Sequence, residues 1–249
     1  MNDLWWAEDV QRVTVFTGAG ISTDSGVPDY RGPQGIWTRD PALADLFTYD
    51  NFLADAEVRV RFWQVFAGRQ GDVLPNAAHR ALAELETGGK ALRVLTQNVD
   101  GLHQKAGMSP RKVVELHGSL ATATCLDCGE RTPSAEAIAR LPEEPRCACG
   151  GLLKPSVVMF GEYLDSDVLS LARRIAAASE LFLAVGSSLR VEPAAGLCAV
   201  AAEHGARLVV VNRDPTPYDG LAVEVVREPI GTAVPRICAV LAGSGPKRH

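Results

Sequence analysis

Seven short apolar runs alternate with helix-like patterns along this chain of 249 residues. Unbroken runs rich in Val, Ile and Leu are typical of parallel strands that are buried on both faces. Between them, apolar residues recur three or four positions apart, as on one face of an amphipathic helix. The pattern predicts an α/β fold, with a Rossmann-like parallel sheet and helices on both faces. The runs are RVTVF (12–16), ALRVLT (91–96), KVVEL (112–116), SVVMF (156–160), ELFLAVG (180–186), RLVVVN (207–212) and AVEVV (222–226).

Two segments interrupt this alternation and predict a second, smaller domain. Residues 41–72 are rich in aromatic side chains and are expected to be a helical insert, and residues 121–153 contain four of the six cysteines. Together they form the predicted small domain. The discontinuous Rossmann-like domain is assigned residues 1–40, 73–120 and 154–243, and residues 244–249 are expected to form a flexible tail.

The charge balance excludes some classes of partner. A net charge of −5 at pH 7 gives no sign of the basic surface that follows phosphates, so no direct nucleic-acid partner is expected. The start of the chain, MNDLWWAEDV, lacks the basic and apolar regions of a signal peptide, and no apolar run reaches the roughly 18 residues of a membrane span. We therefore expect no membrane partner and a cytoplasmic location.

The spacing of four cysteines indicates a metal site. One pair is separated by two residues, eighteen residues follow, and the second pair is separated by one residue, with glycines beside both pairs. Two such knuckles can close a tetrahedral thiolate site, and four thiolates leave no position open for water. We predict one structural Zn²⁺ per chain; the alternative is a set of buried free thiols. The expected ligands are Cys125, Cys128, Cys147 and Cys149.

The segment FTGAGISTDSGVPDYRGPQGIW (16–37) begins like a dinucleotide-binding loop. Gly18 and Gly20 directly follow a predicted strand, where the backbone can turn tightly and approach a pyrophosphate. Thr23 stands where the third glycine of the dehydrogenase fingerprint would be, and the helical signal ends at Pro28. A hydride-transferring dehydrogenase is therefore disfavoured. Taken alone, the loop could also be an ordinary strand-to-helix turn.

Three further polar loops follow predicted strands, namely TQNVDG, GSS and NRD. With the glycine loop they place four sets of polar groups at the carboxyl edge of the sheet, where open α/β sheets bind ligands. His117 also lies just past a strand, and its imidazole suits a general base because its ordinary pKa is about 6.5. His79 is better explained by capping or packing in a helix, whereas His103 could have either a functional role at the site or a structural one.

The motifs GAGISTDSGVPDYRG, TQNVDGLH, ELHGS, KPSVVMFGE, GSS and VNRD, with the cysteine module between them, resemble the sirtuins, which are NAD-dependent protein lysine deacylases. The resemblance extends from about residue 12 to residue 240 in the order of the family. It implies that NAD and an acyl-lysine peptide meet between the two domains. The implied products are nicotinamide, free lysine and 2′-O-acyl-ADP-ribose.

The resemblance also implies roles for residues. His117 would be the base that deprotonates a ribose hydroxyl, and Asn98 and Asp100 would position the ribose and a water. Tyr30 replaces an aromatic residue, usually Phe, in a cofactor-binding loop that the family closes over NAD. The residues implied to contact NAD are Gly18, Ala19, Gly20, Ile21, Ser22, Asp29, Tyr30, Arg31, Trp37, Gln97, Asn98, Val99, Asp100, Gly186, Ser187, Ser188, Asn212, Arg213, Asp214 and Ile230.

The motif SVVMFGE resembles the peptide-binding segment of the family, to which a substrate would add as an extended strand. By position, Val158 would offer its carbonyl to the substrate amide, and Phe160 would line the acyl-lysine tunnel. The alternative for this segment is a plain core strand, which we accept for Val157. The residues implied to bind the peptide are Val158, Met159, Phe160, Gly161 and Glu162.

Acyl selectivity is expected to depend on Phe66 and Arg69. Sirtuins that prefer succinyl or malonyl lysine carry Tyr-x-x-Arg in the helical insert, and here the tyrosine is Phe66. A carboxylate would lose one hydrogen bond, worth about 0.5–1.5 kcal/mol. We expect deacetylation with weak desuccinylation. The alternatives are a deacylase for succinyl or longer chains, a mono-ADP-ribosyltransferase that uses the same NAD site, and an NAD-binding regulatory module without activity.

Overall fold

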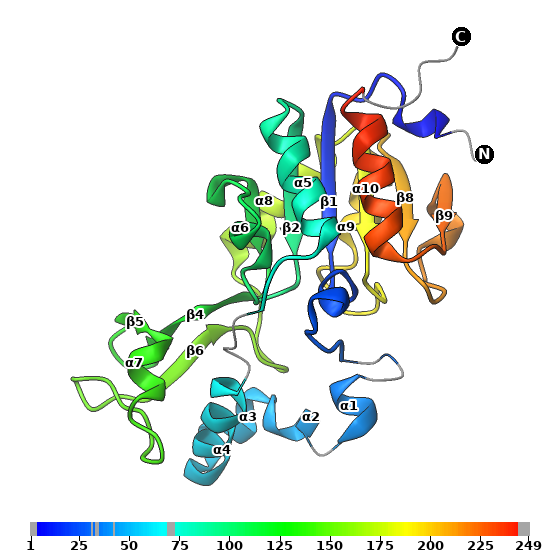
Figure 1. The fold of residues 1–249 in the computed structure, drawn as a ribbon. Helices are drawn as coiled ribbons and strands as arrows, with labels where there is room; N and C mark the ends of the chain where they lie inside the picture. Colours follow the sequence, from blue (N-terminus) through cyan, green and yellow to red (C-terminus); the bar gives the residue numbers. More distant parts are fainter. Residues whose placement is uncertain (1–3, 31, 33–34, 42, 69–72, 244–249) are drawn as a thin grey trace.

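The computed structural model describes residues 4–30, 32, 35–41, 43–68 and 73–243; the predicted tail lies outside this part of the chain. Its centre is a six-stranded sheet that is parallel throughout (Figure 1). The strand order is that of a Rossmann fold, in which the connections reverse direction beside the first strand. In spatial order the strands are β3 (Val113–Glu115), β2 (Ala91–Thr96), β1 (Arg12–Thr17), β7 (Leu181–Val185), β8 (Arg207–Val211) and β9 (Glu224–Val226).

Helices cover both faces of this sheet because its strands carry apolar side chains on both faces. Val13 and Val15 pack into one cluster with α5 (Ala77–Thr87) and α10 (Ile230–Leu241). Phe16 packs into a second cluster on the other face. The helices on that face are α8 (Ser166–Ala177) and α9 (Leu197–Glu203). The predicted α/β fold is therefore confirmed.

A smaller antiparallel sheet lies beyond the carboxyl ends of the parallel strands (Figure 1). Its strands are, in spatial order, β5 (Arg131–Pro133), β4 (Gly118–Cys125) and β6 (Leu153–Val157), with α7 (Ser134–Ile138) beside them. The helical insert follows the first part of the large sheet in sequence and packs on this small sheet through a third apolar cluster. Its helices are α2 (Leu43–Leu46), α3 (Tyr49–Ala54) and α4 (Ala56–Ala67).

The predicted strand over residues 156–160 was wrong in its length and in its sheet. Only Ser156 and Val157 belong to β6, and β6 pairs with β4 in the antiparallel sheet. The amide of Val158 makes the last bond of this ladder, to the carbonyl of His117, and beyond it Phe160 forms an isolated parallel bridge with Thr48 of the helical insert. An unbroken apolar run does not distinguish these two outcomes.

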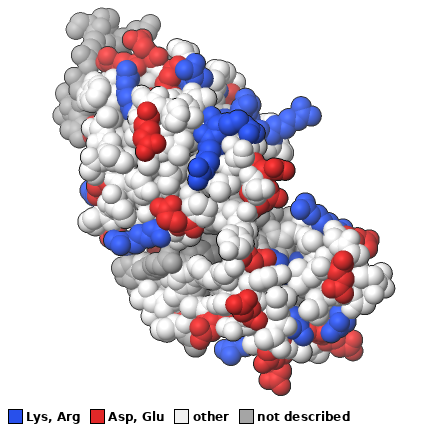
Figure 2. Space-filling model, turned by 180° about the vertical axis from the view of Figure 1, so that it is seen from behind, with Lys and Arg blue, Asp and Glu red and all other residues white. Residues whose placement is uncertain are grey.

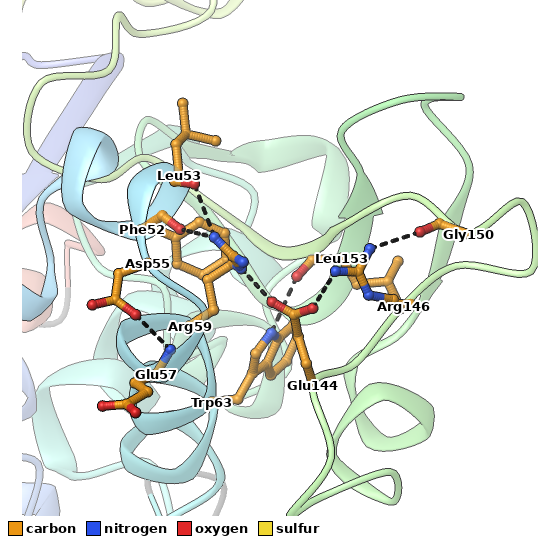
Figure 3. A network of polar contacts seen from close by, with 10 residues as sticks. All are labelled: Phe52, Leu53, Asp55, Glu57, Arg59, Trp63, Glu144, Arg146, Gly150 and Leu153. Atoms are coloured by element: carbon orange, nitrogen blue, oxygen red, sulfur yellow. Dashed lines mark hydrogen bonds and ion pairs between the residues drawn. The ribbon is translucent and has the colours of Figure 1, made fainter.

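A polar network joins the helical insert to the cysteine module (Figure 3). Arg59 of α4 forms an ion pair with Glu144, and its Nη1 donates to the carbonyl of Phe52 at 2.9 Å. Glu144 also pairs with Arg146, whose Nη1 donates to the carbonyl of Gly150 at 3.0 Å. The side chains of Arg59 and Glu144 are only 10% and 15% exposed. One carboxylate therefore links two helices of the insert to the loop that carries the second cysteine pair.

Positive and negative side chains are interspersed over the face shown in Figure 2. Within the described ranges, no helix is long and apolar enough to span a membrane. Shorter helical elements complete the described chain. They are η1 (Trp5–Ala7), η2 (Ala19–Ser25), α1 (Ile36–Arg39), α6 (Leu102–Lys105), η3 (Pro110–Lys112) and η4 (Asp219–Leu221).

Candidate active site

The loops after β1 and β7 pack directly against each other. The amide of Gly18 donates to the carbonyl of Val185 at 3.0 Å, and that of Gly20 to the carbonyl of Gly186 at 2.8 Å. A Cβ at Gly20 would lie 2.8 Å from both the Cα and the carbonyl oxygen of Gly186, which is closer than Cβ contacts occur. The glycines are thus required for close approach of two backbones. This contact lies at the switch point of the sheet, where such folds bind ligands.

The segment after Gly20 is short and irregular, as predicted. A 3₁₀ helix ends at Gly26, which adopts a left-handed conformation with φ 87°. Further on, the amide of Trp37 donates to the carbonyl of Tyr30 at 3.1 Å, and their ring centroids are 4.8 Å apart. The carboxylate of Asp29 accepts from the amide of Gly32 at 2.9 Å. Arg31 lies outside the described residues.

Asn98 and Asp100 are brought to the glycine loop by Ser22. The Nδ2 of Asn98 donates to the carbonyl of Gly18 at 3.2 Å and to the Oγ of Ser22 at 3.1 Å. That Oγ donates to Oδ2 of Asp100 at 2.8 Å, and Oδ1 of Asp100 accepts from the amide of Leu102 at 2.9 Å. The loops after β1 and β2 therefore share one hydrogen-bonded set of polar side chains.

His117 follows β3 and has a defined tautomer. Its Nδ1 lies 3.0 Å from the carbonyl oxygen of Gln97, and because that oxygen only accepts, Nδ1 must carry the proton. The lone pair is then on Nε2. Burial lowers the pKa of His117, although the bond to the Gln97 carbonyl opposes this shift. The ring is therefore neutral at neutral pH and can accept a proton at Nε2.

The loops after β7 and β8 supply further polar groups at this edge. The Nε2 of Gln97 donates to the Oγ of Ser187 at 3.3 Å, which joins the loops after β2 and β7. The Nδ2 of Asn212 donates to the carbonyl of Asp214 at 2.7 Å, and Asp214 pairs with Arg213 in an exposed ion pair. The remaining residues predicted for NAD lie in η2 (Ala19 and Ile21), after β2 (Val99), after β7 (Ser188) and at the start of α10 (Ile230). Their contacts with NAD stay a prediction.

Two buried histidines lie behind the glycine loop. His79 caps α5, since its Nδ1 accepts from the amide of Asn76 at 3.4 Å, and the predicted capping role is confirmed. Nε2 of His103 lies 3.0 Å from the Oγ1 of Thr17. The ring centroids of His79 and His103 are 5.0 Å apart. Burial lowers the pKa of His79 to about 4 and that of His103 to about 3, so both are neutral. The sequence left the role of His103 open, and the structure makes it a support for the end of β1.

The segment predicted to bind peptide runs between His117 and the helical insert. The amide of Val158 donates to the carbonyl of His117 at 2.8 Å. The amide of Phe160 donates to the carbonyl of Phe47 at 2.9 Å, and its carbonyl accepts from the amide of Tyr49 at 2.8 Å. The ring of Phe160 is 41% exposed and lies 5.0 Å from that of Trp37. Aromatic contacts thus connect the predicted cofactor loop to the predicted peptide segment.

Phe66, predicted to influence acyl selectivity, lies at the end of α4. It is only 4% exposed and packs on Phe62 and Trp63, with ring centroids 6.2 Å and 5.3 Å away. Its surroundings are therefore apolar. Arg69 lies outside the described residues.

The four cysteines form one cluster. All four Sγ atoms lie within 4.8 Å of one another, and the closest pairs are 3.5–3.7 Å apart. A tetrahedron with Zn–S bonds of about 2.3 Å has edges of about 3.8 Å, so the cluster has the size that a zinc tetrathiolate requires. Gly129 and Gly150 adopt left-handed conformations beside the two pairs, with φ 75° and 90°. The donor set fits a structural Zn²⁺.

Comparison with known proteins agrees with this site. The Sir2 family matches residues 18–193. NAD-dependent protein deacetylase 2 of Streptomyces coelicolor is 56% identical over 240 residues, which cover 94% of this chain and 98% of the relative. The chain belongs to the Sir2 family.

Solved structures of the family resemble this sirtuin over nearly its whole length. A complex of Sir2 with a p53 peptide and NAD⁺ has a TM-score of 0.84 at 34% identity and covers 96% of this chain and 97% of that one. A Sir2 variant with a deacetylated p53 peptide and 3′-O-acetyl-ADP-ribose has a TM-score of 0.86 at 35% identity, covering 94% and 95%.

One charged residue of this sirtuin was missed by the sequence analysis. Lys154 of β6 is 7% exposed, and its Nζ donates to the carbonyl of Val157 at 2.6 Å and to Glu162 at 3.0 Å. The available signal was a single lysine within the apolar run LLKPSVV, a position where a charge needs a partner.

Proposed function

We propose that this chain removes acyl groups, and acetyl groups most readily, from lysine side chains of proteins in a reaction that consumes NAD. The products would be nicotinamide, deacylated lysine and 2′-O-acyl-ADP-ribose. The observation that carries the proposal is His117, a neutral imidazole at the sheet edge that also carries the glycine loop and the Asn98–Ser22–Asp100 set. The name of the Streptomyces coelicolor relative and the NAD and peptide complexes of Sir2 support it.

The chain's own residues would hold the dinucleotide at the switch point. When bound, NAD supplies an electrophilic ribose carbon and the hydroxyl that receives the acyl group. Gly18 and Gly20 leave backbone without side chains where a pyrophosphate would lie. Ser187 and Asn212 follow the strands beyond the switch point and would contact the adenosine half. Asn98 and Asp100 are held by fixed partners and would orient the nicotinamide ribose.

His117 would act as the general base. Its Nε2 can accept a proton from a ribose hydroxyl, and the Nδ1–H bond to the carbonyl of Gln97 would stabilise the resulting imidazolium. The same bond fixes the ring orientation. A base held in this way is of no use to a protein that only binds NAD, which argues against a purely regulatory module.

The substrate would be a protein or peptide segment in extended conformation. The carbonyl of Val158 accepts no hydrogen bond from any residue that the structure describes, although its own amide is bonded to His117. A substrate amide can supply that missing donor, as when a strand is added to a sheet edge. Recognition through main-chain atoms predicts broad sequence tolerance. The apolar packing of Phe66 favours an acetyl group over a charged acyl chain.

The proposal can be tested with the purified chain, NAD and an acetyl-lysine peptide. Nicotinamide, peptide and acyl-ADP-ribose would be followed by mass spectrometry for wild type, for His117→Ala, and for His204→Ala as a matched control. His204 is exposed at the carboxyl end of α9, beside Arg12 and Arg207, which begin β1 and β8, so it lies at the end of the sheet opposite the site. Among the described residues, its ring bonds to Val200 of its own helix. We expect all three products from wild type and from the control, and a loss of about 10²–10⁴-fold in His117→Ala.

Other outcomes would point elsewhere. If NAD is consumed while its adenylate label appears on protein, the reaction is mono-ADP-ribosyl transfer. If NAD binds without turnover of acetyl, succinyl or longer acyl peptides, the chain is a binding module. If His117→Ala retains full activity, another residue is the base.

A further inference from the structure

Lys154 is a buried charge next to the predicted peptide segment. Its side chain is 8% exposed, and the ammonium lies 5.8 Å from the ring centroid of Tyr49 in the helical insert. Burying an ammonium is costly unless charged and polar partners compensate it. Here the partners are the carboxylate of Glu162 and the carbonyl of Val157, and both belong to the turn that contains the peptide segment.

Glu162 closes that turn from its other end. The Oε2 atom that pairs with Lys154 also accepts from the amide of Met159 at 2.7 Å. The amide of Glu162 in turn donates to the carbonyl of Met159 at 3.1 Å. Gly161 adopts a left-handed conformation with φ 89°, which the turn requires. The ion pair thus ties both ends of a six-residue turn, residues 157–162, to one point.

Within residues 157–160, these bonds leave the carbonyl of Val158 as the acceptor for a substrate. The carbonyl of Val157 is occupied by Lys154, that of Met159 by Glu162, and that of Phe160 by Tyr49. Among the described residues, none donates to the carbonyl of Val158. Because neighbouring carbonyls of an extended segment point to opposite sides, a peptide that paired with the wrong one would be shifted in register and would present its lysine differently.

We propose that Lys154 and Glu162 are positioning residues that fix the register of the bound peptide. By tying the turn and occupying the Val157 carbonyl, the pair presents the carbonyl of Val158 as the acceptor for the substrate amide, while the amide of Val158 stays bonded to the carbonyl of His117. The inference rests on the proposed function for the identity of the substrate. Neither side chain needs to touch the acyl group or NAD.

The test compares Lys154→Met, Lys154→Arg and Glu162→Gln with wild type. Arg12→Met is the matched control, because Arg12 also forms an ion pair but lies at the opposite end of β1 and is 61% exposed. KM for acetyl-lysine peptide, KM for NAD and kcat would be measured for each. Hydrogen–deuterium exchange of the peptic fragment that contains Met159 would be measured in the same samples.

We expect Lys154→Met to raise KM for the peptide about tenfold while KM for NAD stays unchanged, which corresponds to loss of one hydrogen bond to a charged group. The Met159 fragment should exchange faster. Lys154→Arg, which keeps the charge, should recover part of the peptide KM, and the control should match wild type. If Lys154→Met does not fold, Glu162→Gln decides, since a neutral amide of the same size should raise the peptide KM without removing the acceptor for Met159.

The inference would be overturned by folded variants with an unchanged peptide KM, or by equal increases in both KM values. If wild type does not deacylate any peptide, the proposed function fails separately. The exchange measurement then still decides the structural part, because equal exchange of the Met159 fragment in Lys154→Met and wild type would show that the pair does not hold the turn.

Discussion

At the scale of single residues, the protonation state of His117 sets the pH range of the proposed reaction. Burial moves the pKa of this ring below its ordinary value of about 6.5, and only the neutral ring accepts a proton. We therefore expect kcat/KM to be constant above neutral pH and to fall about tenfold per pH unit below the lowered pKa. A profile from pH 5 to pH 9 with saturating zinc would measure this. An inflection above pH 6.5 would contradict the burial argument.

Gly20 offers a second test at this scale, because the space for a side chain is absent. In Gly20→Ala the new methyl group would meet the backbone of Gly186 at 2.8 Å, so the loops after β1 and β7 would have to separate. Overpacking of this kind costs about 1–3 kcal/mol, and we expect KM for NAD to rise about tenfold or more with little change in KM for peptide. Titration calorimetry with NAD would check it. Gly220→Ala is the control, since no atom lies within 4 Å of its added Cβ.

The individual residues differed in how far the sequence could predict them. His117, Asn98 and Asp100 were predicted to lie at one edge of the sheet because each follows a parallel strand. Asn98 and Asp100 both bond to Ser22, and His117 bonds to the carbonyl of Gln97, the residue before Asn98. The sequence did not predict which residue pairs with the buried charge of Lys154. The pairing of Lys154 with Glu162 depends on how a turn folds back, and no periodicity in the sequence specifies that contact.

At the scale of elements, the sequence predicted the strands of the parallel sheet and failed where the chain leaves it. Residues 207–212 and 156–160 both read as buried strands, but only the first run lies in the parallel sheet. The second run ends its pairing with β4 at Val157, and Phe160 pairs instead with Thr48 of the helical insert. Contacts of this kind are tertiary, so an apolar pattern alone does not reveal them.

The link between the helical insert and the cysteine module predicts a stability effect at this scale. In Glu144→Gln the buried guanidinium of Arg59 would lose its charged partner while its environment stays nearly closed to water. Loss of one partner from a buried pair costs about 3–5 kcal/mol, and the remaining exposure of both side chains reduces this to about 2–3 kcal/mol. Urea denaturation would measure the free energy of unfolding. Glu228→Gln breaks a more exposed pair with Arg236 and should cost less than about 1 kcal/mol; equal costs for the two variants would refute the argument.

At the scale of the whole molecule, the large parallel sheet and the small antiparallel sheet are stabilised by different apolar clusters. Two clusters pack on the two faces of the parallel sheet, and none of the four predicted zinc ligands belongs to either. The third cluster joins the helical insert to the small sheet and contains Cys125 and Cys147. The division into domains stays a prediction. The third cluster is the one that would depend on a bound zinc ion, because it contains two of the predicted ligands.

Removal of zinc should therefore affect the two sheets unequally. Without metal, four thiols at 3.5–3.7 Å would no longer be held together, and the small three-stranded sheet has too little core to replace that link. After treatment with a chelator we expect fast hydrogen–deuterium exchange in β4 and β6, with β1, β2, β7 and β8 still protected. Deacetylation should be lost because β6 leads into the peptide segment, whereas ADP-ribose should still bind at the edge of the parallel sheet. Cys125→Ser should reproduce this pattern without chelator, and Cys198→Ser, which changes a buried thiol outside the cluster, should not. Equal loss of protection in both sheets would mean that the molecule unfolds as one unit and that the metal supports the whole chain.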